Sequence, residues 1–204
     1  MFTFMLRVSV LGGVLVLLAA CGAAGADDKK DEKAVELKVG DTAPTFQLRD
    51  DRDKTWSSSD RFGKKWVVIY FYPGDFTPGC TAQANAFKDG MNKLTELGVE
   101  VVGVSGDAVK SHELFKKAQK LNFTLLADEE GTVAKKFGVP FGKGGTVKVK
   151  DADGKPLEIA RAGTAARWTF IIGKDGKVAY KNTKVNPADD AKKITEFITK
   201  AEEK

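Results

Sequence analysis

Cysteine and histidine are scarce in this sequence. Its 204 residues include two cysteines, Cys21 and Cys80, and one histidine, His112. Zinc and copper sites need several such ligands gathered in one place. Because Cys21 lies in a terminal segment, one histidine and one cysteine remain, and we expect neither a metal centre nor a cofactor. His112 falls in an amphipathic stretch, where we expect it to lie at the surface or to cap the helix.

The apolar run at residues 8–20 is shorter than the roughly 20 residues that a membrane-spanning helix needs. It follows Arg7, the one charged residue among residues 1–20, and suits the core of an export signal that is later removed. The run ends in Leu-Ala-Ala-Cys, which resembles the lipobox of bacterial lipoproteins. The resemblance implies cleavage before Cys21 and lipid on its sulfur, with an uncleaved anchor or an ordinary signal as alternatives.

Long blocks of like charge are also missing. The formal net charge is +5, but lysines alternate with acidic residues, as at residues 27–33, which indicates a solvated surface and no nucleic-acid partner. Residues 22–35 are small or charged with little to bury, as in a flexible tether. We therefore expect a signal peptide at 1–20, a lipidated tether at 21–36 and one folded domain at 37–204.

The folded part alternates between strand-like and helix-like patterns. Residues 66–71 are a continuous apolar run of the buried-strand type, and residues 99–104 are another that only Glu100 interrupts. Between them, Phe87, Met91 and Leu94 recur at the spacing of one helix face. This β-α-β unit is expected to be parallel and right-handed, and it predicts an α/β fold.

Weaker patterns predict the remaining elements. They indicate strands at 46–48 and 123–126, helices at 111–120 and 132–137, hairpins around 147–159 and 169–180, and a closing helix with the apolar stripe Ile194, Phe197, Ile198 and Ala201.

Cys80 stands where the strand at 66–71 has ended, a loop rich in proline and glycine has turned, and a helix is about to begin. The first N–H groups of a helix have no internal partners and carry partial positive charge, so they favour an anion. A thiolate is such an anion. The position therefore favours a nucleophilic cysteine, with an inert core cysteine as the alternative.

Pro73, Thr77 and Cys80 form the spacing Pro-x-x-x-Thr-x-x-Cys, which resembles the signature of the peroxiredoxins. The segment YFYPGDFTPGCTAQA is similar to the bacterioferritin comigratory protein, or peroxiredoxin Q, branch of that family. Three more segments resemble the branch in the same order: VGDTAPTFQLRD, LNFTLLADEEGTVAKKFGV and RWTFIIGKDGKV. The resemblance implies a thioredoxin-like α/β fold, with a central mixed β-sheet flanked by helices.

The resemblance also implies roles for four residues. Cys80 would be the peroxidatic thiolate, Thr77 would hydrogen-bond the peroxide, and Pro73 would shield the sulfur from water. Arg167 matches the arginine that stabilises both the thiolate and the departing oxygen.

Each role has a plainer alternative. Pro73 could simply end a strand, Thr77 could serve its own loop backbone, and Arg167 could be a surface cation. Gln83 matches a glutamine of the branch, but its sequence position gives it no firm catalytic role.

Two features depart from the branch. Many members carry a resolving cysteine five residues after the peroxidatic one, and here that position is Asn85. The resemblance then implies a cycle with one cysteine, in which an external thiol reduces the sulfenic acid on Cys80. The region at residues 142–166 also differs from the branch.

Taken together, these features predict a lipid-anchored peroxidase of the cell envelope, acting on hydrogen peroxide and organic hydroperoxides as a monomer or weak dimer. One alternative is a thioredoxin-like thiol-disulfide oxidoreductase of the envelope, which would need a Cys-x-x-Cys pair where Thr77 holds the first position. A second alternative is a non-catalytic lipid-anchored module that keeps the fold.

Overall fold

The computed structural model of the chain describes residues 36–150 and 154–203. The expected export signal, the lipidation site Cys21 and all of the tether except Glu36 lie outside the described residues. Within the described ranges, no helix combines the length and the apolar character that crossing a bilayer would require.

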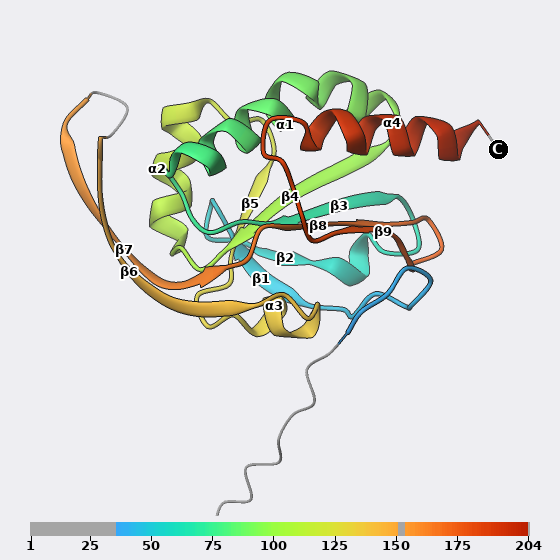
Figure 1. Ribbon diagram of the computed structural model, residues 1–204, viewed down its shortest axis with the longest axis horizontal. Helices are drawn as coiled ribbons and strands as arrows, with labels where there is room; N and C mark the ends of the chain where they lie inside the picture. The colour runs from blue at the N-terminus through green and yellow to red at the C-terminus, as the bar shows by residue number, and fades with distance from the viewer. Residues whose placement is uncertain (1–35, 151–153, 204) are drawn as a thin grey trace, which may run out of the picture. The chain divides into compact units, whose positions relative to one another are not determined.

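A seven-stranded mixed sheet forms the centre of the fold (Figure 1). Its strand order is β2-β1-β5-β4-β3-β8-β9, in which β3, β4 and β5 run parallel and their neighbours pair antiparallel. The strands are β1 (Gln47–Asp50), β2 (Thr55–Ser57), β3 (Trp66–Phe71), β4 (Val99–Ser105), β5 (Thr124–Ala127), β8 (Trp168–Ile172) and β9 (Val178–Asn182).

Helices cover both faces of this sheet. Along β3, Val68 and Tyr70 point to one face, and Ile69 and Phe71 point to the other, because successive side chains of a strand alternate. The first face is covered by α1 (Pro78–Glu96), α2 (Val109–Gln119) and α4 (Asp190–Glu202), and the second by α3 (Thr132–Lys136), as Figure 1 shows. The predicted mixed sheet flanked by helices is confirmed.

The β-α-β unit follows the sequence prediction closely. β3 has the predicted bounds, and Phe87 and Leu94 are fully buried where α1 meets the sheet. Two short elements were not predicted: β2 and the 3-10 helix η1 (Ser58–Asp60). Segments of three residues are too short to show a hydrophobic period.

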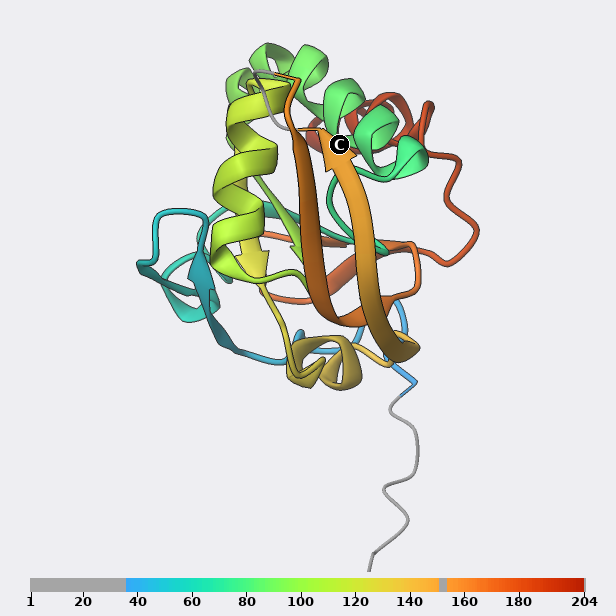
Figure 2. The ribbon, with the colours of Figure 1, turned by 90° about the vertical axis from the view of Figure 1, so that its left-hand side faces the viewer.

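The first predicted hairpin is longer than its sequence pattern suggested. Its strands β6 (Phe141–Lys150) and β7 (Pro156–Ala165) pair antiparallel and form a separate two-stranded sheet. Figure 1 shows this ribbon curving away from the central sheet, and Figure 2 shows it face-on. Most of β6 is exposed. The alternation of apolar and polar residues, which marks a strand with one buried face, could therefore predict only part of it.

The prediction that His112 lies at the surface or caps a helix is wrong. Its side chain is fully buried on α2, and its Nδ1 lies 2.9 Å from Oδ2 of Asp75. The same carboxylate accepts hydrogen bonds from Tyr72 Oη at 2.7 Å and Ser111 Oγ at 2.8 Å. Burial of His112 is tolerated because Asp75 pairs with it. Asp75 comes from a different part of the chain, so a helical pattern alone cannot predict this contact.

Asp75 and His112 form a buried ion pair. Burial opposes ionisation of His112, but the Asp75 carboxylate, the hydrogen bond to it and the nearby Asp107 together raise the histidine pKa above its usual value. Burial likewise works against the Asp75 anion. The charge on His112 and the hydrogen bonds from His112, Tyr72 and Ser111 outweigh it, so the pKa of Asp75 is lowered.

The ion pair predicts a stability that depends on pH. Because the pKa of His112 is raised by folding, its contribution is complete below the unfolded value of about 6.5 and is lost as the pH rises through the folded value. The loss amounts to about 1.4 kcal/mol for each unit between the two values. Urea unfolding from pH 5.5 to pH 9, in a Cys80→Ser background that removes the thiol, should show this decline.

The matched variant is His112→Asn, which should lack the decline between pH 6.5 and the folded pKa. Because His112 is the only histidine in the chain, no other histidine can supply it. An equal slope in the two proteins would contradict the assignment.

Candidate active site

Cys80 is the third residue of α1 and is almost completely buried, with 1% of its surface exposed. Pro78 occupies the first helical position, where its missing N–H costs no hydrogen bond, and Thr77 precedes it in an extended conformation. Thr81 then donates its N–H to the Thr77 carbonyl at 2.8 Å. Cys80 therefore lies in the first turn of α1, as the sequence predicted, and the unpaired N–H groups of such a turn favour an anion.

Arg167 supplies a full positive charge at the sulfur. Its Nη2 donates to Cys80 Sγ at 3.1 Å. The pairing of Phe71 with Trp168, between β3 and β8, brings the residue next to Trp168 close to the loop that follows Phe71. Arg167 is half-buried in this position, so it is not a free surface cation.

A chain of hydrogen bonds continues behind Arg167. Its Nη1 donates to Gln83 Oε1, and Gln83 Nε2 donates to Asp190 Oδ2 at 2.7 Å. The same oxygen accepts from Thr169 Oγ1 at 2.7 Å. Burial raises the pKa of Asp190 despite the hydrogen bonds from Thr169 and Gln83. Both terminal nitrogens of the Arg167 guanidinium thus donate hydrogen bonds, Nη2 to the Cys80 sulfur and Nη1 to Gln83.

Sequence reasoning found only part of this chain. Gln83 had a sequence signal, since it lies one helical turn beyond Cys80, but its contact with Arg167 could not be predicted. Asp190 had none, because an acidic residue in the first turn of a helix is common for local reasons. It is buried and meets Gln83 only because α4 packs against α1.

Thr77 and Pro73 lie in the loop between β3 and α1. Thr77 Oγ1 donates to the Gly74 carbonyl at 3.1 Å, so its hydroxyl serves the loop and keeps lone pairs that can accept a further hydrogen bond. Pro73 is half-buried and follows Tyr72, whose N–H still donates to the Val104 carbonyl. Pro73 thus also ends the ladder between β3 and β4.

Asn85 connects α1 to the end of α2. Its Nδ2 donates to Gln119 Oε1 at 3.2 Å, and its Oδ1 accepts from Lys88 Nζ at 2.7 Å. The helix is continuous from Pro78 to Glu96 through this position. The residue at the place of a resolving cysteine is therefore engaged in helix packing.

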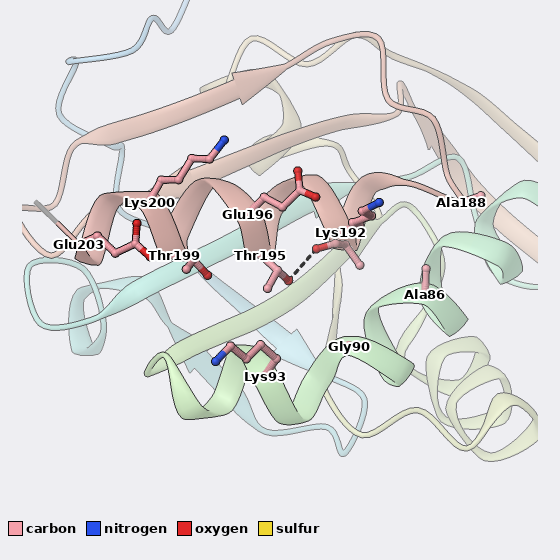
Figure 3. A pocket seen from close by; sticks show the side chains of 11 residues that line it. Ala86, Gly90, Lys93, Ala188, Lys192, Thr195, Glu196, Thr199, Lys200 and Glu203 are labelled. Carbon is pink, nitrogen blue, oxygen red and sulfur yellow. Dashed lines mark hydrogen bonds between the residues drawn. The ribbon is translucent and has the colours of Figure 1, made fainter.

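A groove of about 510 Å³ lies away from the sulfur, between α1 and α4 (Figure 3). Gly90 and Lys93 line it from α1, and Thr195 and Thr199 line it from α4. None of the candidate catalytic residues contributes to its lining. Among residues 36–150 and 154–203, no three or more His, Cys, Asp or Glu side chains are gathered so as to hold a metal ion.

Comparison with known proteins gives a consistent result. Residues 39–181 match the AhpC/TSA family. The chain is 47% identical over 150 residues to the chloroplastic peroxiredoxin Q of Sedum lineare, covering 74% of this chain and 71% of that protein. It is 45% identical over 145 residues to the putative peroxiredoxin bcp of Coxiella burnetii, covering 71% and 87%. The match to the chloroplastic peroxiredoxin Q of rice spans 58% of that protein's length.

Solved structures extend the comparison to the fold. The crystal structure of peroxidoxin BcpB from Mycobacterium tuberculosis superposes with a TM-score of 0.66 at 30% identity, covering 81% of this chain and 98% of that one. The predicted thioredoxin-like α/β fold is confirmed. The chain belongs to the AhpC/TSA family and, within it, to the peroxiredoxin Q and bacterioferritin comigratory protein branch.

Proposed function

We propose that the chain is a thiol-dependent peroxidase that reduces hydrogen peroxide and organic hydroperoxides through Cys80. The observation that supports this most strongly is the 3.1 Å contact between Arg167 Nη2 and Cys80 Sγ at the start of α1. A guanidinium and a helix N-terminus at one sulfur stabilise a thiolate, and the thiolate is the nucleophilic form of cysteine.

In the first step the Cys80 thiolate attacks the terminal oxygen of ROOH. A sulfur–oxygen bond forms as the oxygen–oxygen bond breaks, and the leaving alkoxide takes a proton to become ROH. The sulfur is oxidised to a sulfenic acid and the peroxide is reduced. Negative charge moves from sulfur to the leaving oxygen, so fixed donors along that path lower the barrier.

Arg167 is the donor best placed for this transfer. Its planar fork contacts the sulfur through Nη2 while Gln83 holds Nη1, and Asp190 fixes Gln83 in turn. The guanidinium is therefore oriented before the reaction and need not reorganise during it. A lysine would keep the charge but could not make both contacts.

Thr77 and Pro73 complete the proposed site. The Thr77 oxygen has unused lone pairs for a peroxide O–H, and its hydroxyl can turn toward a peroxide oxygen. Pro73 has no N–H and shields the sulfur from water.

The first prediction concerns peroxide turnover. The full chain, purified in mild detergent, should consume hydrogen peroxide and an organic hydroperoxide when a small dithiol is supplied. Cys80→Ser should abolish the activity, and Arg167→Lys should lower kcat/KM about 100-fold, as expected for a lost transition-state donor. Arg49→Lys is the matched control, because Arg49 is an exposed cation paired with Asp53.

Insulin reduction, measured in parallel, addresses the alternative activity. Turnover of insulin without turnover of peroxide would indicate a thiol-disulfide oxidoreductase, and neither activity would indicate a non-catalytic module. Either result would overturn the proposed peroxidase.

We further propose that the cycle uses one cysteine and an external thiol. Residues five apart in a helix have Cα atoms roughly 8–9 Å apart, beyond the roughly 7 Å that a disulfide spans. A cysteine at position 85 would therefore require the start of α1 to unwind. Asn85 instead ties α1 to α2 through Gln119, which favours a helix that stays folded. One thiol would displace water from the sulfenic acid to form a mixed disulfide, and a second would release Cys80.

Intact-mass spectrometry tests this cycle. After one equivalent of peroxide the protein should gain one oxygen atom, and excess peroxide should add a second, because no other protein thiol is proposed to trap the sulfenic acid. Added thiol should instead give a mixed disulfide, and Cys80→Ser should show none of these products. A Cys80–Cys80 disulfide between two chains, forming as fast as peroxide is consumed, would contradict the cycle.

For location, we propose that residues 1–20 are an export signal, that residues 21–36 form a tether lipidated at Cys21, and that the domain at 37–204 works on the cell envelope as a monomer or weak dimer. The apolar run at 8–20 and the sequence Leu-Ala-Ala-Cys support this. The reducing thiol would then come from a small thiol or a thioredoxin-like protein of the same compartment.

Fatty-acid labelling tests the anchor. In a bacterial host with lipoprotein machinery, the chain should incorporate labelled fatty acid and fractionate with membranes. Cys21→Ser should abolish the label, whereas Cys80→Ser should retain it as the matched cysteine control. An unlabelled wild-type chain would remove the anchor from the proposal.

A further inference from the structure

Arg161 joins the hairpin of β6 and β7, here called the hairpin, to the loop before Cys80. This loop, residues 72–77, is here called the Cys80 loop. Arg161 lies in the middle of β7, and its side chain is only 7% exposed, although most of the hairpin is open to solvent. Its Nε donates to Asp107 Oδ1 at 2.9 Å, and its Nη2 donates to the Asp75 carbonyl at 2.8 Å. The guanidinium therefore contacts the Cys80 loop directly.

Asp107 also holds Asp75. The contacts that Arg161 and Asp107 make with each other and with the Asp75 backbone are here called the clasp. Asp107 lies in the turn between β4 and α2, and its Oδ2 accepts the Asp75 N–H at 2.9 Å and the Ser105 hydroxyl at 2.7 Å. Asp75 is thus held at its N–H by Asp107, at its carbonyl by Arg161, and at its carboxylate by α2 and Tyr72. Of these partners, Arg161 is the one contributed by the hairpin.

Close packing accompanies these hydrogen bonds. A Cβ at Gly74 would lie 2.2 Å from Arg161 Cζ, so the guanidinium rests on the bare backbone of the Cys80 loop. Nearby, Ala162 donates its N–H to the Gly106 carbonyl at 3.2 Å. A Cβ at Gly106 would lie 2.4 Å from the Gly163 carbonyl oxygen. The backbone of β7 thus lies against Gly106 directly after Arg161, at Ala162 and Gly163.

The clasp lies next to a strained part of the loop. Phe76 has a φ of 60°, a conformation that is unfavourable for a bulky residue and persists only where the surroundings enforce it. Asp75 on one side is fixed by the clasp, and the Phe76 ring packs against Phe115 with ring centroids 5.1 Å apart. Thr77 follows directly, and its hydroxyl donates to the Gly74 carbonyl, next to the peptide that Arg161 holds.

We infer that Arg161 is a positioning residue for peroxide reduction, and this inference rests on the proposed function of Cys80. It holds Gly74 and Asp75 so that the Thr77 hydroxyl is aimed where the peroxide binds. Through Arg161, the hairpin thereby fixes the conformation of the Cys80 loop. The hairpin lies in the region, residues 142–166, that differs from the branch. Arg161 touches neither the sulfur nor the peroxide in this scheme and acts through Thr77.

Kinetics of the reduced full chain with hydrogen peroxide test the inference. Arg161→Ala should lower the second-order rate constant about 10- to 100-fold, the range expected when a binding group is misplaced by about 1 Å. Arg161→Lys should lose less, because one of the two hydrogen bonds can survive. Lys148→Ala is the matched control, since Lys148 is an exposed cation of the same hairpin, with 85% of its side chain accessible.

A double-mutant cycle with Thr77→Val separates positioning from general stability. If Arg161 acts through Thr77, Arg161→Ala should cost less than about two-fold in the Thr77→Val background. The same fold-loss in both backgrounds would overturn the inference, as would a rate constant for Arg161→Ala within two-fold of wild type. If Arg161→Ala does not fold, Arg161→Lys carries the same comparison.

Hydrogen exchange at the Asp75 amide gives a readout that does not depend on activity. Exchange should accelerate at least 10-fold in Arg161→Lys and stay unchanged in Lys148→Ala, because the clasp protects that N–H. An inactive wild-type chain with this exchange pattern would refute the proposed peroxidase but leave the clasp intact. An active wild-type chain with unchanged Asp75 exchange in Arg161→Lys would refute the positioning role alone.

Discussion

The proposed site depends on the charges that surround the sulfur of Cys80, which is almost completely buried. A thiolate there needs compensating charge within contact distance, because burial alone disfavours the anion. The fold meets this need with the start of α1 and with Arg167, whose Nη2 lies 3.1 Å from the sulfur. Both groups come from one piece of architecture, since α1 follows β3 and Arg167 precedes its neighbour β8.

Two hydrogen-bond networks hold the residues around Cys80. Behind the sulfur, Arg167, Gln83 and Asp190 link the start of α1 to the start of α4. In the loop before the sulfur, Asp75 is held by groups from α2, from the turn after β4 and from the hairpin. Hydrogen bonds inside a protein are strengthened by the low local dielectric, and a buried polar group that loses its partner is costly. The site is therefore held by side chains as well as by backbone.

The sequence predicted the features that depend on local pattern. The bounds of β3, the burial of Phe87 and Leu94, and the position of Cys80 at a helix start all follow from hydrophobic period and turn residues. Arg167 was found only through its resemblance to a family motif. Nothing in its local sequence indicates that it meets Cys80, a residue 87 positions away.

The buried polar partners could not be predicted for the same physical reason. His112 looked like a surface residue because a helical pattern counts it as polar, and its partner Asp75 lies 37 positions earlier. No sequence pattern indicates a role for Arg161, because its carboxylate partner Asp107 is 54 positions away. Such pairs are decided by tertiary packing, which a periodic pattern of apolar residues does not encode.

Asn85 and the hairpin of β6 and β7 fit together in the proposed cycle. A resolving cysteine five residues after the first would have to be reached by unwinding the start of α1, and a loop held at Asp75 by partners from several elements would resist that motion. With Asn85 in that place, tied to Gln119, the proposed cycle never requires the helix to open. The positioning role inferred for Arg161 then opposes no step of the proposed cycle, so Thr77 and Cys80 can keep their relative positions throughout it. In this proposal the hairpin and Asn85 serve the same cycle, in which a site that stays folded is paired with an external reductant.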